Sequence, residues 1–369
     1  MLKRFKFMKE SLLSSLFCIG IFMLQAQELT WRNPLTEKVI QGRSKEVLES
    51  DGFARLPLAL KESVREPVWN LGNQSAGVYI DFKTAAEEIT VRYQVKGALN
   101  MPHMPSTGVS GLDLYAKDPQ DNSWKWAHGG YSFKDTITYT FKNLGSHPSY
   151  EYRLYLPMYN KVEWMEIGTS SAEPISFLKS EGKPIVVYGT SIAQGACATR
   201  PGLGWTNILG RNFEQEVINL AFSGNGRLEQ PILDLINKVD ASVYILDCIP
   251  NLGLTKDRDA AKLKALIEHA VEFLRKDHPN TPIIMADHSS SEVPGVLNGK
   301  PNDNFKESSR IGRETIEGLK KKGVKNLYWL SSEDIGLDID NTVDYAHPND
   351  IGMEKIAKAY WELLRKVLR

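Results

Sequence analysis

The sequence predicts two folded domains of different class. These are an antiparallel β-sandwich over residues 27–178 and, over residues 179–369, a doubly wound α/β domain with a five-stranded parallel sheet. The length of 369 residues exceeds the usual size of a single core, and 42% hydrophobic residues indicate a folded chain. The first half alternates polar and apolar residues, which is typical of half-buried strands. The second half has short continuous apolar runs, typical of strands covered on both faces.

The first 26 residues have the pattern of a secretory signal peptide. Four basic residues within the first ten precede an apolar stretch from Leu12 to Leu24, and a small-residue site ends at Ala26. A membrane-spanning helix is the alternative, but a span needs about 20 apolar residues, and Ser14 and Ser15 interrupt this shorter stretch. We therefore expect a secreted or periplasmic protein with no span in the mature chain.

Charge and cysteine content bound the possible partners and chemistry. Cleavage after Ala26 would remove four basic residues and one acidic residue from totals of 45 each, leaving 41 and 44 and a net charge of minus three. This balance indicates no nucleic-acid partner and no anionic membrane surface. The same cleavage would remove Cys18 and leave two cysteines, Cys197 and Cys248. These two could form a disulfide in an oxidising compartment or stay as two buried thiols.

The β-sandwich is predicted from two clear alternating segments. In one, Ile89, Val91, Tyr93 and Val95 alternate with polar neighbours, and a similar pattern runs through residues 150–156. Turn-rich stretches such as residues 118–122 separate the strands of this region, whereas residues 27–76 carry no clear pattern.

The α/β domain is predicted from apolar runs that alternate with amphipathic segments. The expected parallel strands are residues 185–188, 217–222, 243–246, 283–286 and 327–330, and the clearest helices are residues 260–276, 305–322 and 350–368. Polar residues follow three of these strands: Ser191 the first, Ser223-Gly224-Asn225 the second and Asn251 the third. Asp344 and His347 precede the last helix. Because ligands bind at the carboxyl ends of the strands in such sheets, we expect these residues to converge there.

Three of the converging residues are the groups that a serine hydrolase requires. A serine hydroxyl needs a histidine to accept its proton and a carboxylate to orient that histidine, and Ser191, His347 and Asp344 supply these groups. The simpler alternatives are that Ser191 caps a helix and that Asp344 accepts hydrogen bonds from nearby backbone amides. His288, which follows the fourth strand, is the competing candidate for the base.

Attack on an ester also requires donors for the oxyanion. The backbone amides of Ser191 and Gly224 and the side-chain amide of Asn251 are the candidates. The alternative for Gly224 is an ordinary tight turn, or the start of a dinucleotide fingerprint, but Glu229 occupies the third glycine position of that fingerprint. With no Walker loop and no spaced Cys/His cluster, the sequence favours chemistry without a cofactor or metal.

Four blocks in this order resemble those of the SGNH (GDSL-type) hydrolases: residues 189–192, 222–226, 247–251 and 344–348. Upstream, Gly111-Leu112-Asp113-Leu114-Tyr115 resembles the signature of the β domain that precedes the catalytic domain in one bacterial branch of these esterases. The resemblance implies an SGNH-type fold, with Ser191, His347 and Asp344 as the triad and Ser191, Gly224 and Asn251 as the oxyanion hole. Thr190 departs from the family's aspartate. The rival α/β-hydrolase elbow requires glycine where Ala193 stands.

The expected substrate is an acetylated carbohydrate, either a small molecule or an oligosaccharide ester, cleaved through an acyl-serine intermediate. His103, Arg200, Trp205 and His288 are the candidate substrate contacts, because aromatic and planar polar groups suit sugars. The alternatives are a lipase or thioesterase for longer acyl chains, acyl transfer to a sugar, and a glycan-binding protein without catalysis. The sequence leaves the oligomeric state open.

Overall fold

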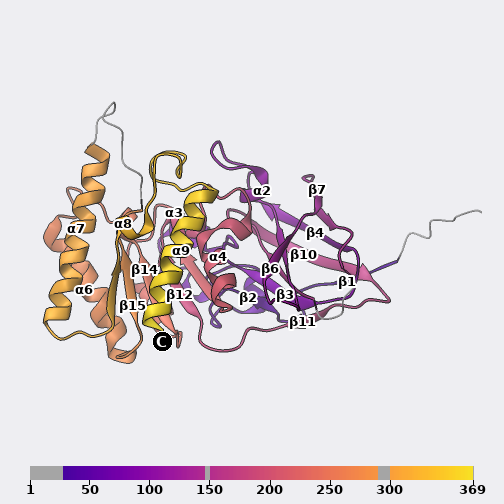
Figure 1. Ribbon diagram of the computed structural model, residues 1–369, viewed down its shortest axis with the longest axis horizontal. Helices are drawn as coiled ribbons and strands as arrows, with labels where there is room; N and C mark the ends of the chain where they lie inside the picture. The colour runs from indigo at the N-terminus through magenta and orange to yellow at the C-terminus, as the bar shows by residue number, and fades with distance from the viewer. Residues whose placement is uncertain (1–27, 146–149, 290–299, 369) are drawn as a thin grey trace, which may run out of the picture.

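The computed structural model describes residues 28–145, 150–289 and 300–368. A β-rich part and an α/β part lie end to end (Figure 1). The expected signal peptide lies outside the described residues, so its cleavage and the secretion of the chain stay predictions. Across the described ranges, no helix combines the length and apolar character that crossing a membrane requires.

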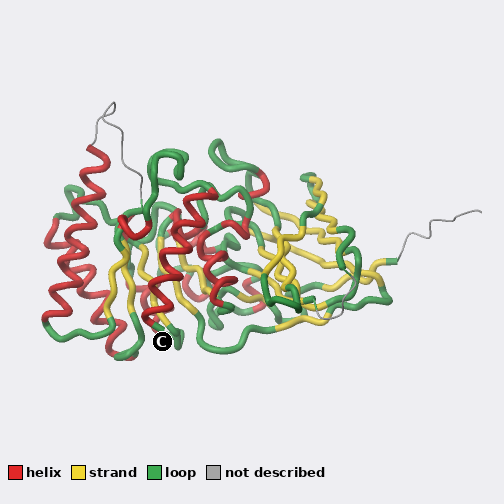
Figure 2. Tube along the Cα trace, viewed as in Figure 1, coloured by secondary structure: helices red, strands yellow, loops and turns green. Residues whose placement is uncertain are grey.

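The β-rich part consists of two antiparallel sheets (Figure 2). In spatial order, the first contains β1 (Leu29–Arg32), β10 (Lys161–Ser170), β4 (Ile89–Lys96), β8 (Ile137–Phe141) and β7 (Gly130–Ser132). The second contains β11 (Ser176–Leu178), β3 (Tyr79–Lys83), β9 (Glu151–Tyr155), β5 (Asp113–Lys117) and β6 (Trp124–Ala127), with β2 (Ile40–Gln41) paired to β3. Val91 and Ile167 of the first sheet and Ile80 and Leu154 of the second belong to one buried cluster. The alternation therefore places one apolar face of each sheet against the other, as predicted.

The α/β part contains a five-stranded parallel sheet. Its strands, in spatial order, are β13 (Val217–Ala221), β12 (Ile185–Gly189), β14 (Val243–Asp247), β15 (Ile283–Ala286) and β16 (Leu327–Leu330). Every residue of the three strands β12, β13 and β14 is buried, which explains why they appear as continuous apolar runs. The strand order reverses at β12, so the ends of β12 and β14 flank the switch point where ligands bind in such sheets. The fold class is as predicted.

Helices cover both faces of the parallel sheet. The helices are α1 (Glu66–Gly72), α2 (Ser106–Val109), α3 (Ser191–Gln194), α4 (Trp205–Phe213), α5 (Gln230–Asn237), α6 (Ala260–Asp277), α7 (Lys300–Lys321), α8 (Ser332–Ile335) and α9 (Asp350–Val367). Helices α6 and α7 lie on one side of the strands and α4 and α9 on the other (Figure 1). Helices α5, α6 and α7 share a core with alternate strand residues such as Tyr188 and Leu246, while α4 and α9 share the opposite core with Val187 and Ile245. The period of two along each strand divides its side chains between the two cores.

The segment of residues 42–77, which the sequence left without a pattern, packs against the α/β part. Leu56 and Val68 belong to the core on the α5–α7 face of the parallel sheet. The fully buried Arg55 donates to the backbone carbonyls of Asn219 and Ala221 at 3.1 and 2.6 Å, and so ties this segment to β13. Domain limits at residues 178 and 179 stay a prediction, and the contacts show that the two parts share core residues.

Candidate active site

Ser191 lies at the tight turn that joins β12 to the short helix α3. Thr190 caps this helix, because its hydroxyl accepts a hydrogen bond from the Ile192 amide at 3.4 Å. A Cβ at Gly189 would lie 2.6 Å from the Cβ of Ala193, so the turn requires glycine there. Ser191 is 7% exposed, so packing restricts its side chain.

His347 comes from the loop before α9 and meets the Ser191 hydroxyl. Its Nε2 lies 2.8 Å from Ser191 Oγ, and its Nδ1 lies 2.7 Å from Asp344 Oδ2. The left-handed backbone of Tyr345, with φ of 65°, turns the chain so that residues 344 and 347 face each other. The Val343 amide donates to the His347 carbonyl at 2.9 Å and closes this loop.

The Asp344 carboxylate performs both of the tasks that the sequence suggested as alternatives. Oδ1 accepts hydrogen bonds from the backbone amides of His347 and Ala346 at 2.7 and 3.1 Å, while Oδ2 accepts from the His347 ring. Partial burial opposes ionisation, but these hydrogen bonds and the charge of His347 outweigh it and lower the pKa of Asp344. The carboxylate is therefore ionised at neutral pH, which fixes the ring with its proton on Nδ1.

A side-chain hydrogen bond of Asn251 joins the loops after β13 and β14. The Gly226 amide donates to Asn251 Oδ1 at 3.0 Å, and this contact fixes the orientation of the Asn251 carboxamide. Its Nδ2 is then the free end, and no described residue accepts a hydrogen bond from it. Gly224 is exposed with φ of 69°, and no atom lies within 4 Å of the place that a Cβ would take. Of the two groups that were expected to bind an oxyanion, Gly224 thus has open space beside it and Asn251 has an unused donor.

Gln194, the last residue of α3, braces the site, and sequence reasoning missed it. Its Oε1 accepts from the Ser223 amide at 2.9 Å, and its Nε2 donates to Gln74 Oε1 at 2.7 Å. Tyr159 of the β-rich part also reaches the site, donating to the Ser191 carbonyl at 3.4 Å. The available signal for the role of Gln194 was its position three residues after Ser191, in a short helix whose residues are all buried.

Two other histidines lie near His347. The ring centroid of His103, which belongs to an exposed loop of the β-rich part, lies 6.4 Å from that of His347. His288 is buried and stacks on Phe305 at 3.9 Å. Burial and the nearby charge of His347 lower the pKa of His288 to about 3, so this ring is neutral near pH 7. The ring that contacts Ser191 Oγ belongs to His347.

The family of the chain follows from comparison with known proteins. Residues 182–365 match the model of the GDSL-like lipase/acylhydrolase family, and residues 29–175 match the model for the N-terminus of SGNH-hydrolase-type esterases. A crystal structure from Bacteroides ovatus, described as a GDSL-like lipase, is 34% identical with a TM-score of 0.82, and the match covers 92% of this chain and 98% of that chain. The chain belongs to the GDSL-like lipase/acylhydrolase family. The predicted resemblance is confirmed, and the protein is an ester-hydrolysing enzyme.

Two further solved structures share the fold of this GDSL-like hydrolase at low identity. A salicylyl-acyltransferase from a tetracycline biosynthetic pathway is 18% identical with a TM-score of 0.74, covering 92% of this chain and 97% of that chain. A family two carbohydrate esterase from Cellvibrio japonicus is 12% identical with a TM-score of 0.51, covering 79% of this chain and 89% of that chain. No curated protein matches the chain.

Two of the expected substrate contacts in the hydrolase, Trp205 and Arg200, contact other side chains of the protein. Trp205 is fully buried and stacks on Tyr360 of α9 with ring centroids 4.6 Å apart, so it cannot touch a substrate. The Arg200 guanidinium is engaged by the Asp113 carboxylate at 2.5 Å and the Tyr115 hydroxyl at 2.7 Å. An aromatic ring and an arginine near the serine were consistent with sugar binding. In the structure, Trp205 joins α4 to α9, and Arg200 joins the loop after α3 to β5.

The disulfide left open by the sequence does not form. Cys197 and Cys248 are both free and buried. Burial raises the pKa of Cys197 to about 12 and raises that of Cys248 as well, so both thiols stay protonated at neutral pH. The two cysteines are therefore core side chains of the hydrolase.

Proposed function

We propose that the enzyme hydrolyses carboxylic esters through an acyl-serine intermediate, with acetylated carbohydrate as its substrate class. The observation that carries the proposal is the chain of two hydrogen bonds that links Ser191 Oγ to His347 Nε2 and His347 Nδ1 to Asp344 Oδ2, at 2.8 and 2.7 Å. Both distances are those of a nucleophile, its base and the group that orients the base.

In the first step, His347 Nε2 accepts the Ser191 proton as Oγ attacks the ester carbonyl carbon. The tetrahedral intermediate collapses, the C–O bond to the alcohol breaks, and His347 returns the proton to the leaving alkoxide. In the second step, His347 accepts a proton from water, the resulting hydroxide attacks the acyl-serine, and the acid leaves as Ser191 regains its proton. Asp344 stabilises the imidazolium that forms in each step.

The oxyanion of each intermediate would accept hydrogen bonds from the amides of Ser191 and Gly224 and from Asn251 Nδ2. The hydrogen bond from Gly226 to Asn251 Oδ1 supports this role, since it places the donor end of the carboxamide on the opposite side. Donors that are fixed before the reaction stabilise the developing charge most effectively, because they need not reorganise.

The choice of acetylated sugar is supported by the polar groups around Ser191. His103 lies beside His347, and Asn225 and Arg65, which are hydrogen-bonded to each other at 2.7 Å, lie at the loop that carries Gly224. The family two carbohydrate esterase with the same fold adds support by analogy only. We also propose export, which rests on the basic and apolar pattern of the first 26 residues.

The test is hydrolysis of p-nitrophenyl acetate and p-nitrophenyl octanoate by the wild type and Ser191→Ala. We expect acetate to be the better substrate and Ser191→Ala to lower kcat about a million-fold. The matched control is Ser132→Ala, an exposed serine of β7, which should keep full activity. Preference for octanoate would contradict the acetyl assignment and favour a lipase. Equal background rates for wild type and Ser191→Ala, including on acetylated oligosaccharides, would favour a glycan-binding protein.

A further inference from the structure

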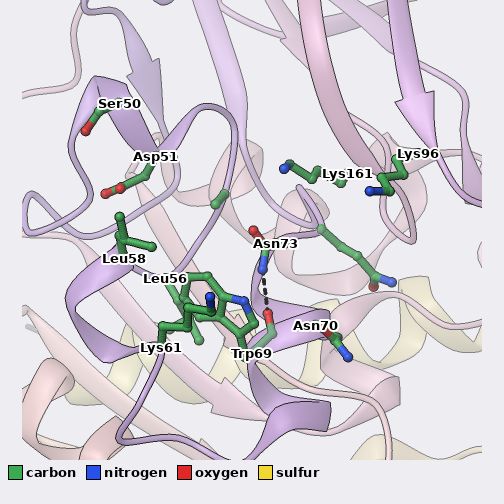
Figure 3. Close-up of a pocket in the computed structure, with 12 residues that line it drawn as sticks. Ser50, Asp51, Leu56, Leu58, Lys61, Trp69, Asn70, Asn73, Lys96 and Lys161 are labelled. Carbon is green, nitrogen blue, oxygen red and sulfur yellow. Dashed lines mark hydrogen bonds between the residues drawn. The ribbon is translucent and has the colours of Figure 1, made fainter.

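A pocket of about 520 Å³ lies where α1 and the segment before it meet the ends of β4 and β10 (Figure 3). Lys96 and Lys161 line its strand side, and Trp69 and Asn73 line its helical side with Lys61. Its volume falls within the range of about 300–1,000 Å³ that is usual for small-molecule sites. The catalytic groups described above use none of these side chains.

The pocket carries an excess of positive charge. Its lining contains three lysines, Lys61, Lys96 and Lys161, and one carboxylate, that of Asp51. The Asp51 carboxylate already accepts a hydrogen bond from the Leu48 amide at 2.8 Å. Among the described residues, none of the three lysines has an acidic partner. Lys96 and Lys161 are directly opposite each other in the antiparallel register of β4 and β10. Like charges in that arrangement repel, and a bound anion would relieve the repulsion.

The helical side of the pocket offers an aromatic ring and carboxamides. The Trp69 side chain is half-buried, and Asn73 Nδ2 donates to the Trp69 carbonyl at 2.8 Å, which leaves Asn73 Oδ1 as an acceptor for a ligand. A flat apolar ring beside fixed hydrogen-bonding groups suits the face and the hydroxyls of a pyranose. Lysines and an indole together therefore favour a sugar that carries an anionic group.

Three hydrogen bonds link this pocket, or residues close to it in sequence, to the segments that carry Ser191 and Gly224. Gln74, which lines the pocket, accepts a hydrogen bond from Gln194 of the Ser191 helix at 2.7 Å. Lys161 follows Tyr159 by two residues, a Cα separation of at most about 7 Å, and Tyr159 donates to the Ser191 carbonyl.

On the helical side, Trp69 follows Arg65 by about one helical turn, 6 Å. Arg65 donates to Asn225 Oδ1 at 2.7 Å, next to Gly224. Both sides of the pocket are thus linked to residues around Ser191 and Gly224.

We propose that this pocket binds a uronic acid unit of the substrate, with its carboxylate between Lys96 and Lys161 and its ring against Trp69. The inference rests on the proposed function, because the acetylated unit would occupy the Ser191 site while the neighbouring acidic unit occupies the pocket. The enzyme would then act on acetylated acidic glycans in preference to neutral ones.

Two readouts test the pocket. In the first, kcat/KM is measured on an O-acetylated oligogalacturonide and on its carboxyl-reduced counterpart, which differs only in lacking carboxylates. The double variant Lys96→Gln/Lys161→Gln should lower the ratio of the acidic to the neutral kcat/KM about tenfold, the sum of two partly exposed ion pairs. The control Lys125→Gln/Lys142→Gln removes the same charge from exposed positions elsewhere on the β-rich part and should keep the wild-type ratio.

The second readout is calorimetric binding of unacetylated trigalacturonate to Ser191→Ala with and without the lysine substitutions, which needs no catalysis. We expect binding to weaken about tenfold in the double variant and to weaken also in Trp69→Ala. This result would support the pocket even if the wild type cleaved neither acetylated oligosaccharide. An unchanged ratio and unchanged binding in the double variant would overturn it. An enzyme that cleaves both oligosaccharides with equal kcat/KM would leave the esterase proposal standing and refute the acidic subsite.

Discussion

The Asn251 carboxamide divides its two ends between the fold and the reaction. Oδ1 accepts a hydrogen bond from the Gly226 amide at 3.0 Å, and we propose that Nδ2 donates to the oxyanion. Asn251→Asp keeps an acceptor for Gly226 and replaces the donor with a negative oxygen. We expect kcat to fall at least 10²- to 10³-fold, the usual cost of losing one oxyanion donor, while the melting temperature changes little.

The companion variant is Asn251→Ala, which also removes the acceptor for Gly226. It should show a similar loss of kcat together with about 1 kcal/mol lower unfolding free energy. Steady-state kinetics and chemical denaturation measure the two effects separately. If Asn251→Asp kept kcat within tenfold of the wild type, Asn251 would not be an oxyanion donor.

Asp247, at the end of β14, makes stability depend on pH. Burial raises the pKa of its carboxyl to about 7, compared with 3.8 in an unfolded chain. The folded protein therefore binds more protons between these pH values, and the unfolding free energy falls as the pH rises through that interval, by up to about 4 kcal/mol. Asp247→Asn should remove this fall. Urea denaturation at pH 5 and pH 8 measures the part of the fall above pH 5, about 3 kcal/mol, with the exposed Asp240→Asn as control. Parallel pH dependences in wild type and Asp247→Asn would contradict this prediction.

At the scale of elements, the Gly-x-Asp-Leu-Tyr segment fastens the β-rich part to the loop after α3. The Asp113 carboxylate of β5 accepts hydrogen bonds from Trp126 Nε1 at 2.6 Å, Arg200 Nη1 at 2.5 Å and the Gly202 amide at 2.9 Å. Because this loop begins a few residues after Ser191, β5 helps to hold the strand–helix turn that carries Ser191.

Arg200→Met should therefore destabilise the protein in a pH-dependent manner. Burial already raises the pKa of Asp113, and the Arg200 charge opposes that shift. Without Arg200 the buried carboxylate is uncompensated, which costs about 3–5 kcal/mol at pH 8. The cost should shrink at pH 5, where the carboxyl can take up a proton.

Denaturation at both pH values checks this result. Lys183→Met, which breaks the exposed ion pair with Asp240, should cost less than about 1 kcal/mol at either pH. A cost for Arg200→Met that is equal at pH 5 and pH 8 would show that lost packing, and not the charge of Asp113, dominates.

The elements that were predictable from sequence are those whose pattern is set by their own burial. The five parallel strands appear as apolar runs because both faces are covered, and their observed ends lie within one residue of the prediction. The contact between Asp344 and His347 was predictable because the two residues are three positions apart in one loop. Trp205 was misassigned because its burial depends on α9, about 150 residues away, and Gln194 was missed because its partners come from three other segments.

At the scale of the whole molecule, the two parts share core residues. Met104, Val109 and Met158 of the β-rich part belong to the core of the parallel sheet on the α4 and α9 face, whereas Leu56 and Val68 belong to the opposite core. A continuous apolar core couples the unfolding of the segments that share it. We therefore expect the enzyme to unfold as one cooperative unit despite its two classes of sheet.

Arg55 is the side chain that most directly tests this coupling. It is fully buried, and its guanidinium donates to the carbonyls of Gln74, Leu71, Asn219 and Ala221, at 2.8, 2.7, 3.1 and 2.6 Å. Burial lowers the pKa of Arg55 to about 9, so it is still a cation at neutral pH and is stabilised by these carbonyl dipoles. Arg55→Leu would leave four buried acceptors without this donor, each worth about 1–3 kcal/mol.

We expect the wild type to show one calorimetric transition, with far-ultraviolet circular dichroism and tryptophan fluorescence changing together. Arg55→Leu should lower the unfolding free energy by at least about 3 kcal/mol and separate the two signals, since the segment of residues 42–77 would no longer be held to β13. Arg32→Leu removes an arginine that is about one-third exposed and pairs with Glu37, and should cost less than about 1 kcal/mol. Two resolved transitions in the wild type would show instead that the β-rich part folds independently, and that the shared core residues do not couple it to the domain that carries Ser191.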